Sequence, residues 1–217
     1  MRGCADWQHG GGKLLLKAFI PERLRIEASS LFIILSLLAV GDVLNCLLLF
    51  LACFIHESGH LVCAGLCQRR IKELSISASG AKISLAGNLG SYKKDIAIAL
   101  SGSAANFFTC VMMRLFIGEF TKAQVFFFFC NLLLGLCNLI CAGDLDGAVA
   151  TESVLYYCLE ADVAARAFGI LQGIGAFLLL ALGMGVMALT GGNFSVLFLW
   201  LGILTKNKKD RKSGLFR

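Results

Sequence analysis

Long apolar runs dominate this sequence and leave few folds open to it. Of its 217 residues, 58% are hydrophobic and 16% are charged, and the mean hydropathy is +0.79. A helix needs about 20 apolar residues to cross a bilayer core. Runs of this type occupy residues 43–66, 96–117, 123–142 and 167–189, with shorter runs at 29–40 and 194–204. We therefore expect an all-α membrane protein, a polytopic bundle of about six transmembrane helices.

Charged residues divide the chain into three parts. We expect residues 1–27 to form a cytoplasmic N-terminal segment, 28–205 a transmembrane domain and 206–217 a basic cytoplasmic tail. Lysine and arginine gather at both ends and between residues 69 and 94, so the positive-inside rule predicts that both termini are cytoplasmic. The mixed N-terminal segment lacks the pattern of a secretory signal peptide. A multi-pass membrane protein with both termini in the cytoplasm is expected.

The net charge of +6 does not predict a nucleic-acid surface. The basic residues lie just outside the apolar runs and are not interleaved with aromatic residues, so membrane topology explains them better. The ten cysteines fall mainly in or beside the apolar runs, where cysteine behaves as a small buried apolar residue. The expected surroundings are a lipid bilayer, with no nucleic-acid partner.

Residues 74–89, between the second and third predicted spans, have a strand-like pattern. Leu74, Ile76 and Ala78 alternate with serines, and after Gly80 the alternation resumes in the opposite phase. A period of two residues predicts β-strands. We expect a small membrane-associated β-hairpin or sheet, which is either a simple surface hairpin or an edge for pairing with an extended substrate.

Two of the three histidines lie inside an apolar run. His56 and His60 are four residues apart in a predicted helix of about residues 43–67, so both rings share one face and can bind one metal ion, with Glu57 beside them as a base. Ionisable residues inside a membrane span are costly and indicate function. The alternative is a pair of core histidines bonded to helix carbonyls. If the span enters at Val43, His56 lies about 20 Å in, nearer the cytoplasmic face.

A catalytic zinc site needs a third protein ligand, because such sites usually combine three protein ligands with one water. Asp42 lies on the wrong side of the predicted membrane. Asp144 and Asp146, at the end of a predicted span of about residues 123–147, remain as candidates. Cys63 and Cys67 follow His60 on the same side of its helix and are rival ligands.

Three segments resemble the site-2 protease family of intramembrane metalloproteases. Beyond the histidine motif, the segment from Asn138 to Asp146 and Gly147 is similar to the family's second signature, and Gly102 to Asn106 resembles the start of its next helix. The resemblance covers about residues 25–147 and is strongest to the stage IV sporulation protein FB branch, which implies a bacterial inner or cell membrane. It implies that Asp146 is the third ligand. Ser103 and Cys141 occupy positions where the family usually has proline.

The resemblance implies a zinc-dependent endopeptidase. His56, His60 and Asp146 would bind Zn²⁺, and Glu57 would act as the general base. Asn106 and Asn138 would hold the substrate backbone or the oxyanion, or else only join helices by hydrogen bonds. The expected substrate is a transmembrane or membrane-tethered protein, such as a transcription-factor precursor, and a regulatory membrane partner is possible. The alternatives are a metal-binding membrane transporter and an inactive protease relative.

Overall fold

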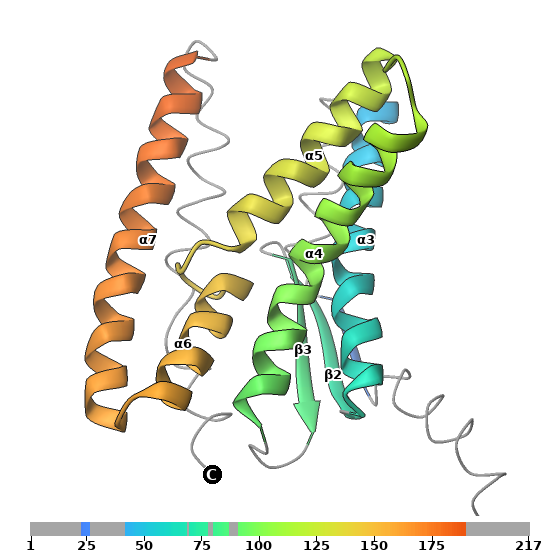
Figure 1. The fold of residues 1–217 in the computed structure, drawn as a ribbon. Coiled ribbons are helices and arrows are strands. Elements are labelled where there is room, and N and C mark those ends of the chain that lie inside the picture. Colours follow the sequence, from blue (N-terminus) through green and yellow to red (C-terminus); the bar gives the residue numbers. More distant parts are fainter. Residues whose placement is uncertain (1–22, 27–41, 69, 78–79, 87–90, 190–217) are drawn as a thin grey trace, which may run out of the picture.

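The computed structural model describes residues 23–26, 42–68, 70–77, 80–86 and 91–189. These residues form five helices and three short strands (Figure 1). The helices are α3 (Val43–Leu66), α4 (Tyr92–Phe116), α5 (Lys122–Asn138), α6 (Asp146–Cys158) and α7 (Ala161–Leu189). The strands are β1 (Arg23–Ile26), β2 (Arg70–Ser77) and β3 (Gly80–Ala86).

Local sequence signals set the ends of the helices that carry the site. Asp42 caps α3 by accepting a hydrogen bond from the backbone N–H of Leu44, and side-chain caps of this kind satisfy otherwise unpaired amides. The helix ends before Gln68, whose φ of 56° turns the chain towards β2. At α5, Thr121 and Gln124 form a reciprocal capping box. The N-terminal caps therefore mark the starts of α3 and α5 independently of the hydrophobic pattern.

Helices α3, α4 and α5 pack on one another, and α6 lies between α4 and α7. Small residues bring the first three close together. A Cβ added to Gly59 would lie 2.5 Å from the carbonyl oxygen of Ser101, and one added to Gly135 would lie 2.8 Å from the ring of Phe107. Close approach through small residues is typical of helices that pack in membranes. The result is a tight three-helix core.

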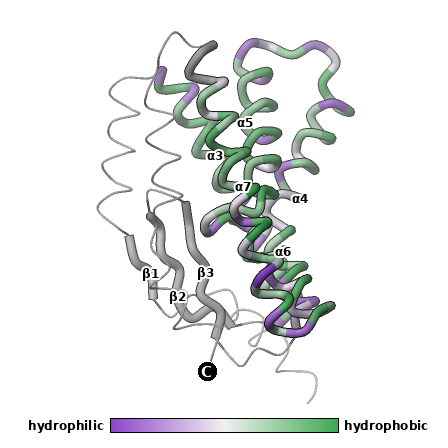
Figure 2. Tube along the Cα trace, turned by 90° about the vertical axis from the view of Figure 1, so that its left-hand side faces the viewer, coloured by the Kyte–Doolittle hydropathy of each residue, from purple (hydrophilic) through white to green (hydrophobic). Residues whose placement is uncertain are grey.

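The outer surface of the bundle is apolar. Phe54 on α3 is 69% exposed and Phe177 on α7 is 71% exposed, and hydrophobic residues cover most of the helix length (Figure 2). A water-soluble monomer rarely exposes so continuous an apolar surface. Three described helices, α3, α4 and α7, are long and apolar enough to cross a membrane. The structure therefore fits a membrane protein.

The prediction of about six spans is wrong for the chain as described. Helix α5 is apolar but has only 17 residues. It ends at Asn138, and the last four residues of the apolar run at 123–142 lie in the turn that follows. The predicted spans at 29–40 and 194–204 lie outside the described residues. The segment that begins at residue 146, which is not part of any predicted apolar run, forms α6. Asp146 consequently starts a helix, where a span was expected to end.

The strand-like segment contributes two strands of a three-stranded sheet of order β1-β2-β3. Strands β2 and β3 are antiparallel, with Leu74 opposite Ile83. Strand β1, within the segment expected to be an N-terminal cytoplasmic region, pairs in parallel with β2. Since β2 has a neighbour on each side, β3 is an edge strand of the described sheet. Strand β2 follows α3 directly and contacts it.

Candidate metal centre

The two motif histidines lie on the inner face of α3. His56 is 4% exposed and His60 is 6% exposed. Their spacing of four residues stacks them one turn apart, and their Nε2 atoms are 3.2 Å from each other. The rings meet edge to face, with centroids 4.8 Å apart. Both rings therefore direct the same nitrogen towards one point in the core.

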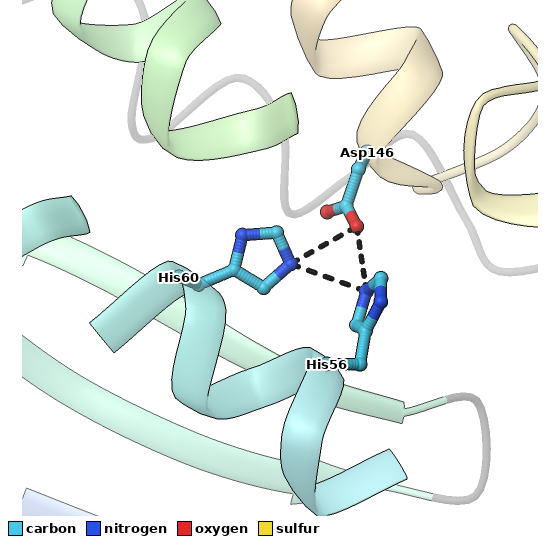
Figure 3. A group of neighbouring side chains, drawn as sticks. All are labelled: His56, His60 and Asp146. Atoms are coloured by element: carbon cyan, nitrogen blue, oxygen red, sulfur yellow. Dashed lines mark hydrogen bonds and ion pairs between the residues drawn. The ribbon is translucent and has the colours of Figure 1, made fainter. Parts of the chain in front are cut away.

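Asp146 reaches that point from the first turn of α6. Its Oδ2 lies 2.9 Å from Nε2 of His56 and 3.1 Å from Nε2 of His60 (Figure 3). All three candidate ligand atoms lie within 4.8 Å of one another. The Asp146 side chain is 24% exposed, whereas those of the histidines are 5% and 8% exposed. The centre is thus closed by α3 and more open at the carboxylate.

The turn between α5 and α6 positions Asp146. Gly143 adopts a φ of 52°, a left-handed conformation that glycine adopts without steric cost. The side-chain N–H of Gln172 on α7 donates to the carbonyl oxygen of Gly143 over 3.2 Å. Gly147 packs so tightly that an added Cβ would overlap the carbonyl group of Leu139. Helix α7 and two glycines therefore hold the turn that presents the carboxylate.

The donor set fits a divalent metal ion. Nδ1 of His60 lies 2.7 Å from the carbonyl oxygen of Ile98. A carbonyl can only accept, so Nδ1 carries the proton and Nε2 of the neutral ring presents a lone pair. The carboxylate of Asp146 is also an acceptor. Three ligand atoms so close together can share one cation, and two imidazoles with one carboxylate form a common catalytic zinc set.

Gly102 on α4 leaves the space that this cluster occupies. A Cβ at this position would overlap Nε2 of His60 and lie 2.8 Å from Cε1 of His56. The backbone of α4 therefore forms one wall of the centre, directly against both rings. Only glycine fits there without moving a ligand.

The structure brings together His56, His60 and Asp146 but not every candidate ligand. Cys63, Cys67 and Asp144 do not belong to the group of converging ligand atoms among the described residues. Of the two aspartates left open by spacing, Asp146 is therefore the one at the histidines.

The remaining predicted residues lie around the cluster. Glu57 is next to His56 on α3 and half-buried. Asn106 on α4 is fully buried. Asn138 is the last residue of α5, and its amide nitrogen donates to the carbonyl oxygen of Leu134 within its own helix. Three further residues of the site were not predicted from the sequence: Ile98, Gln172, and Gly102 as a steric requirement. Of these three, only Gly102 could have been found from the sequence, because it begins the segment from Gly102 to Asn106 that resembles the site-2 protease family.

No protein-family model matches the sequence, and no curated protein matches it. Among solved structures, the chain is similar to the site-2 protease from Methanocaldococcus jannaschii, with a TM-score of 0.60 and 17% sequence identity. The similarity covers 91% of this chain and 94% of that chain. The chain has a site-2 protease fold. This fold extends well beyond residues 25–147, to which the sequence resemblance was limited, whereas the relation to the sporulation branch stays a prediction.

Proposed function

We propose that the protein is an intramembrane zinc metalloendopeptidase that cleaves a membrane-embedded or membrane-tethered protein near the cytoplasmic face. The observation that carries this proposal is the convergence of His56, His60 and Asp146 inside an apolar bundle with a site-2 protease fold. Burying two imidazoles and a carboxylate in such surroundings is costly, and it is explained by a cation that all three bind.

His56, His60 and Asp146 would hold the metal through their converging atoms. Bound zinc would supply Lewis-acid chemistry, polarising the scissile carbonyl and lowering the pKa of water towards neutrality. Three protein ligands leave a coordination position for water or substrate. The larger exposure of Asp146 supports an approach from the α6 side.

Glu57 would serve as the general base. It follows His56 directly on α3, is half-buried, and does not belong to the converging ligand set. A carboxylate beside the ligands can take a proton from the attacking water and pass it to the leaving amine. Because Glu57 lies next to a metal ligand but is not itself a ligand, its position supports the role of general base.

A transmembrane substrate must unwind before cleavage, because its backbone amides are paired within its helix. Strand β3 has a free pairing side within the described sheet and follows β2, which contacts α3. An unwound substrate segment could add to this edge as a further strand. Asn138, whose amide nitrogen is bonded within α5, would offer its side-chain oxygen to substrate N–H groups.

The positive-inside pattern supports cytoplasmic termini and a centre nearer the cytoplasmic side. Substrates of this type include membrane-tethered transcription-factor precursors, and a membrane partner could regulate access. These proposals follow from the family resemblance together with the charge distribution.

Co-expression with a panel of single-span precursor proteins tests the proposal. Wild-type protein should release a cytoplasmic fragment from at least one precursor, and Glu57→Gln should release none. Zinc should co-purify with both proteins. Zinc transport into proteoliposomes without cleavage would instead support a transporter, and zinc binding without either activity would support an inactive relative.

A further inference from the structure

Several polar atoms in the core have no hydrogen-bond partner among the described residues. They are Nδ1 of His56, Oγ of Ser103, both amide atoms of Asn106, and Oδ1 of Asn131. All four residues are at most 4% exposed. Buried polar groups are nearly always paired with protein or with ordered water. This group of atoms, which we call the core polar group, therefore needs an explanation.

Helix packing places the α3 and α4 members close together. A Cβ on Gly102 would lie 2.8 Å from Cε1 of His56, so the His56 ring faces α4 at that level. Asn106 lies four residues beyond Gly102, on the same face of α4 and one turn further along. The α3–α4 contact continues there, because Ala105 lies against Gly59.

Helix α5 brings Asn131 to the same region. Sγ of Cys110 on α4 donates to the carbonyl oxygen of Phe128 on α5, and Phe107 lies against Gly135. Asn131 lies between these two contacts along α5. Its amide nitrogen donates to the carbonyl oxygen of Phe127, which leaves Oδ1 as the buried acceptor.

The two ring nitrogens of His56 face different surroundings. Nε2 faces His60 and Asp146, while Nδ1 lies on the far side of the ring (Figure 3). When Nε2 of a neutral imidazole binds a metal, Nδ1 carries the proton and donates a hydrogen bond. His60 already has such a partner in Ile98. His56 has none within the described residues.

For three residues of the core polar group, namely His56, Asn106 and Asn131, the unpaired donors and acceptors match. Nδ1–H of His56 needs an acceptor, and Asn106 offers Oδ1. The amide N–H of Asn106 needs an acceptor, and Asn131 offers Oδ1. Polar groups separated by more than direct hydrogen-bonding distance are commonly joined by a buried water.

We propose that Asn106 is a positioning residue that orients His56 by accepting the Nδ1–H hydrogen bond through a buried water, and that Asn131 fixes the Asn106 amide in turn. This inference rests on the proposed metal centre. It assigns Asn106 a different role from holding substrate, in keeping with its complete burial. Outer partners of this kind fix the orientation and tautomer of ligating histidines.

Metal affinity of the full-length protein in detergent tests the proposal. Asn106→Leu should weaken Zn²⁺ binding, measured by competition with a chromophoric chelator, by about 10–100-fold. It should also change the visible absorption spectrum of the Co²⁺-substituted protein. Asn106→Asp keeps an acceptor oxygen and should bind Zn²⁺ close to wild-type affinity. Asn131→Leu should weaken binding less than Asn106→Leu.

Thr109→Val is the matched control, because it removes a hydroxyl group from α4 that donates only to the carbonyl oxygen of Ala105 in the same helix. It should leave Zn²⁺ affinity and the Co²⁺ spectrum unchanged. Thermal unfolding of the metal-free proteins separates positioning from folding. A lower unfolding temperature of Asn106→Leu, with normal metal binding and spectrum in the folded fraction, would overturn the proposal.

Two outcomes distinguish this inference from the proposed function. If wild-type protein binds no Zn²⁺, the metal centre itself is wrong. If wild-type protein binds Zn²⁺ and cleaves substrate, but Asn106→Leu changes only KM, then Asn106 contacts substrate and the positioning role is overturned. If Asn106→Leu does not fold, the Asn131→Leu variant decides. Unchanged Zn²⁺ affinity and an unchanged Co²⁺ spectrum in that variant would overturn the proposed link from Asn131 through Asn106 to His56.

Discussion

His60 on α3 donates a 2.7 Å hydrogen bond from Nδ1 to the backbone carbonyl oxygen of Ile98 on α4. This contact joins the two helices and fixes which ring nitrogen faces Asp146. Because the acceptor is a backbone atom near the start of α4, the ligand geometry depends on how the two helices pack. Substitutions that shift α4 against α3 should therefore affect the metal centre even when every ligand is intact.

Glu57→Gln should retain zinc and lose proteolysis. The amide cannot accept the proton of the attacking water, and general-base catalysis typically contributes about 10²–10⁴-fold in rate. Zinc content by mass spectrometry and fragment release in a reconstituted assay measure the two effects separately. Cleavage at the wild-type rate would remove Glu57 from the mechanism.

Asp146→Asn should weaken zinc binding and cleavage together. The neutral amide lacks the charge that balances the metal next to His56 and His60. We expect a loss of affinity of at least the roughly 10–100-fold seen when outer partners of a metal ligand are removed. Chelator competition gives the affinity. Asp144→Asn is the control, since Asp144 is not part of the converging group, and equal losses in both variants would contradict the assignment.

Gly102→Ala should disrupt the metal centre by steric overlap alone. The added methyl group would overlap Nε2 of His60, so zinc affinity and cleavage should both fall strongly. Gly169→Ala on α7 is the matched control, because no atom lies within 4 Å of its added Cβ. That variant should keep activity, as alanine is favoured over glycine by roughly 0.5–1 kcal/mol within a helix. Similar losses in both would indicate a general effect of helix glycines.

Gln172→Leu should lower activity without removing any candidate ligand. The change deletes the hydrogen bond to the Gly143 carbonyl oxygen, worth about 0.5–1.5 kcal/mol in a typical case, and loosens the turn before Asp146. We expect a several-fold lower kcat and weaker zinc binding. Leu171→Ala, at an exposed neighbouring position, should have little effect. Zinc affinity by chelator competition and initial cleavage rates compare the two.

Removal of the metal should stop cleavage reversibly. A zinc chelator should abolish fragment release, and added Zn²⁺ should restore it. Helix content by circular dichroism should stay nearly constant, because α3, α4 and α5 are packed through apolar and small residues beyond the centre. Activity that persists in metal-free protein would exclude a metalloprotease mechanism.

The histidine pair could be located from sequence because helical spacing is a local property. His56 and His60 need only one regular helix to face the same point. Asp146 is 86 residues from His60, and spacing alone did not distinguish it from Asp144 as the third ligand. The family resemblance separated the two aspartates, and the structure brings Asp146 to the histidines.

Other features depend on tertiary packing and leave no chemical pattern. The Ile98 contact uses a backbone oxygen, which every residue possesses. Helix α6 was missed because its residues mix polar and apolar side chains, and β1 because four residues gain a strand conformation only by pairing with β2. Among the described residues, the run at 123–142 was wrongly counted as a full span because an apolar run does not reveal where its helix ends.

The early end of α5 has a consequence for the lipid around the molecule. Seventeen residues give a helix of about 26 Å at 1.5 Å per residue, shorter than a hydrocarbon core of roughly 30 Å. In a bilayer of that thickness, a helix of this length would leave the turn that follows it, and Asp146, below the headgroups, where irregular backbone persists only beside protein or water. Hydrophobic mismatch of this kind is relieved by local compression of the acyl chains. We therefore expect bilayer thickness to influence how near water comes to the carboxylate of Asp146.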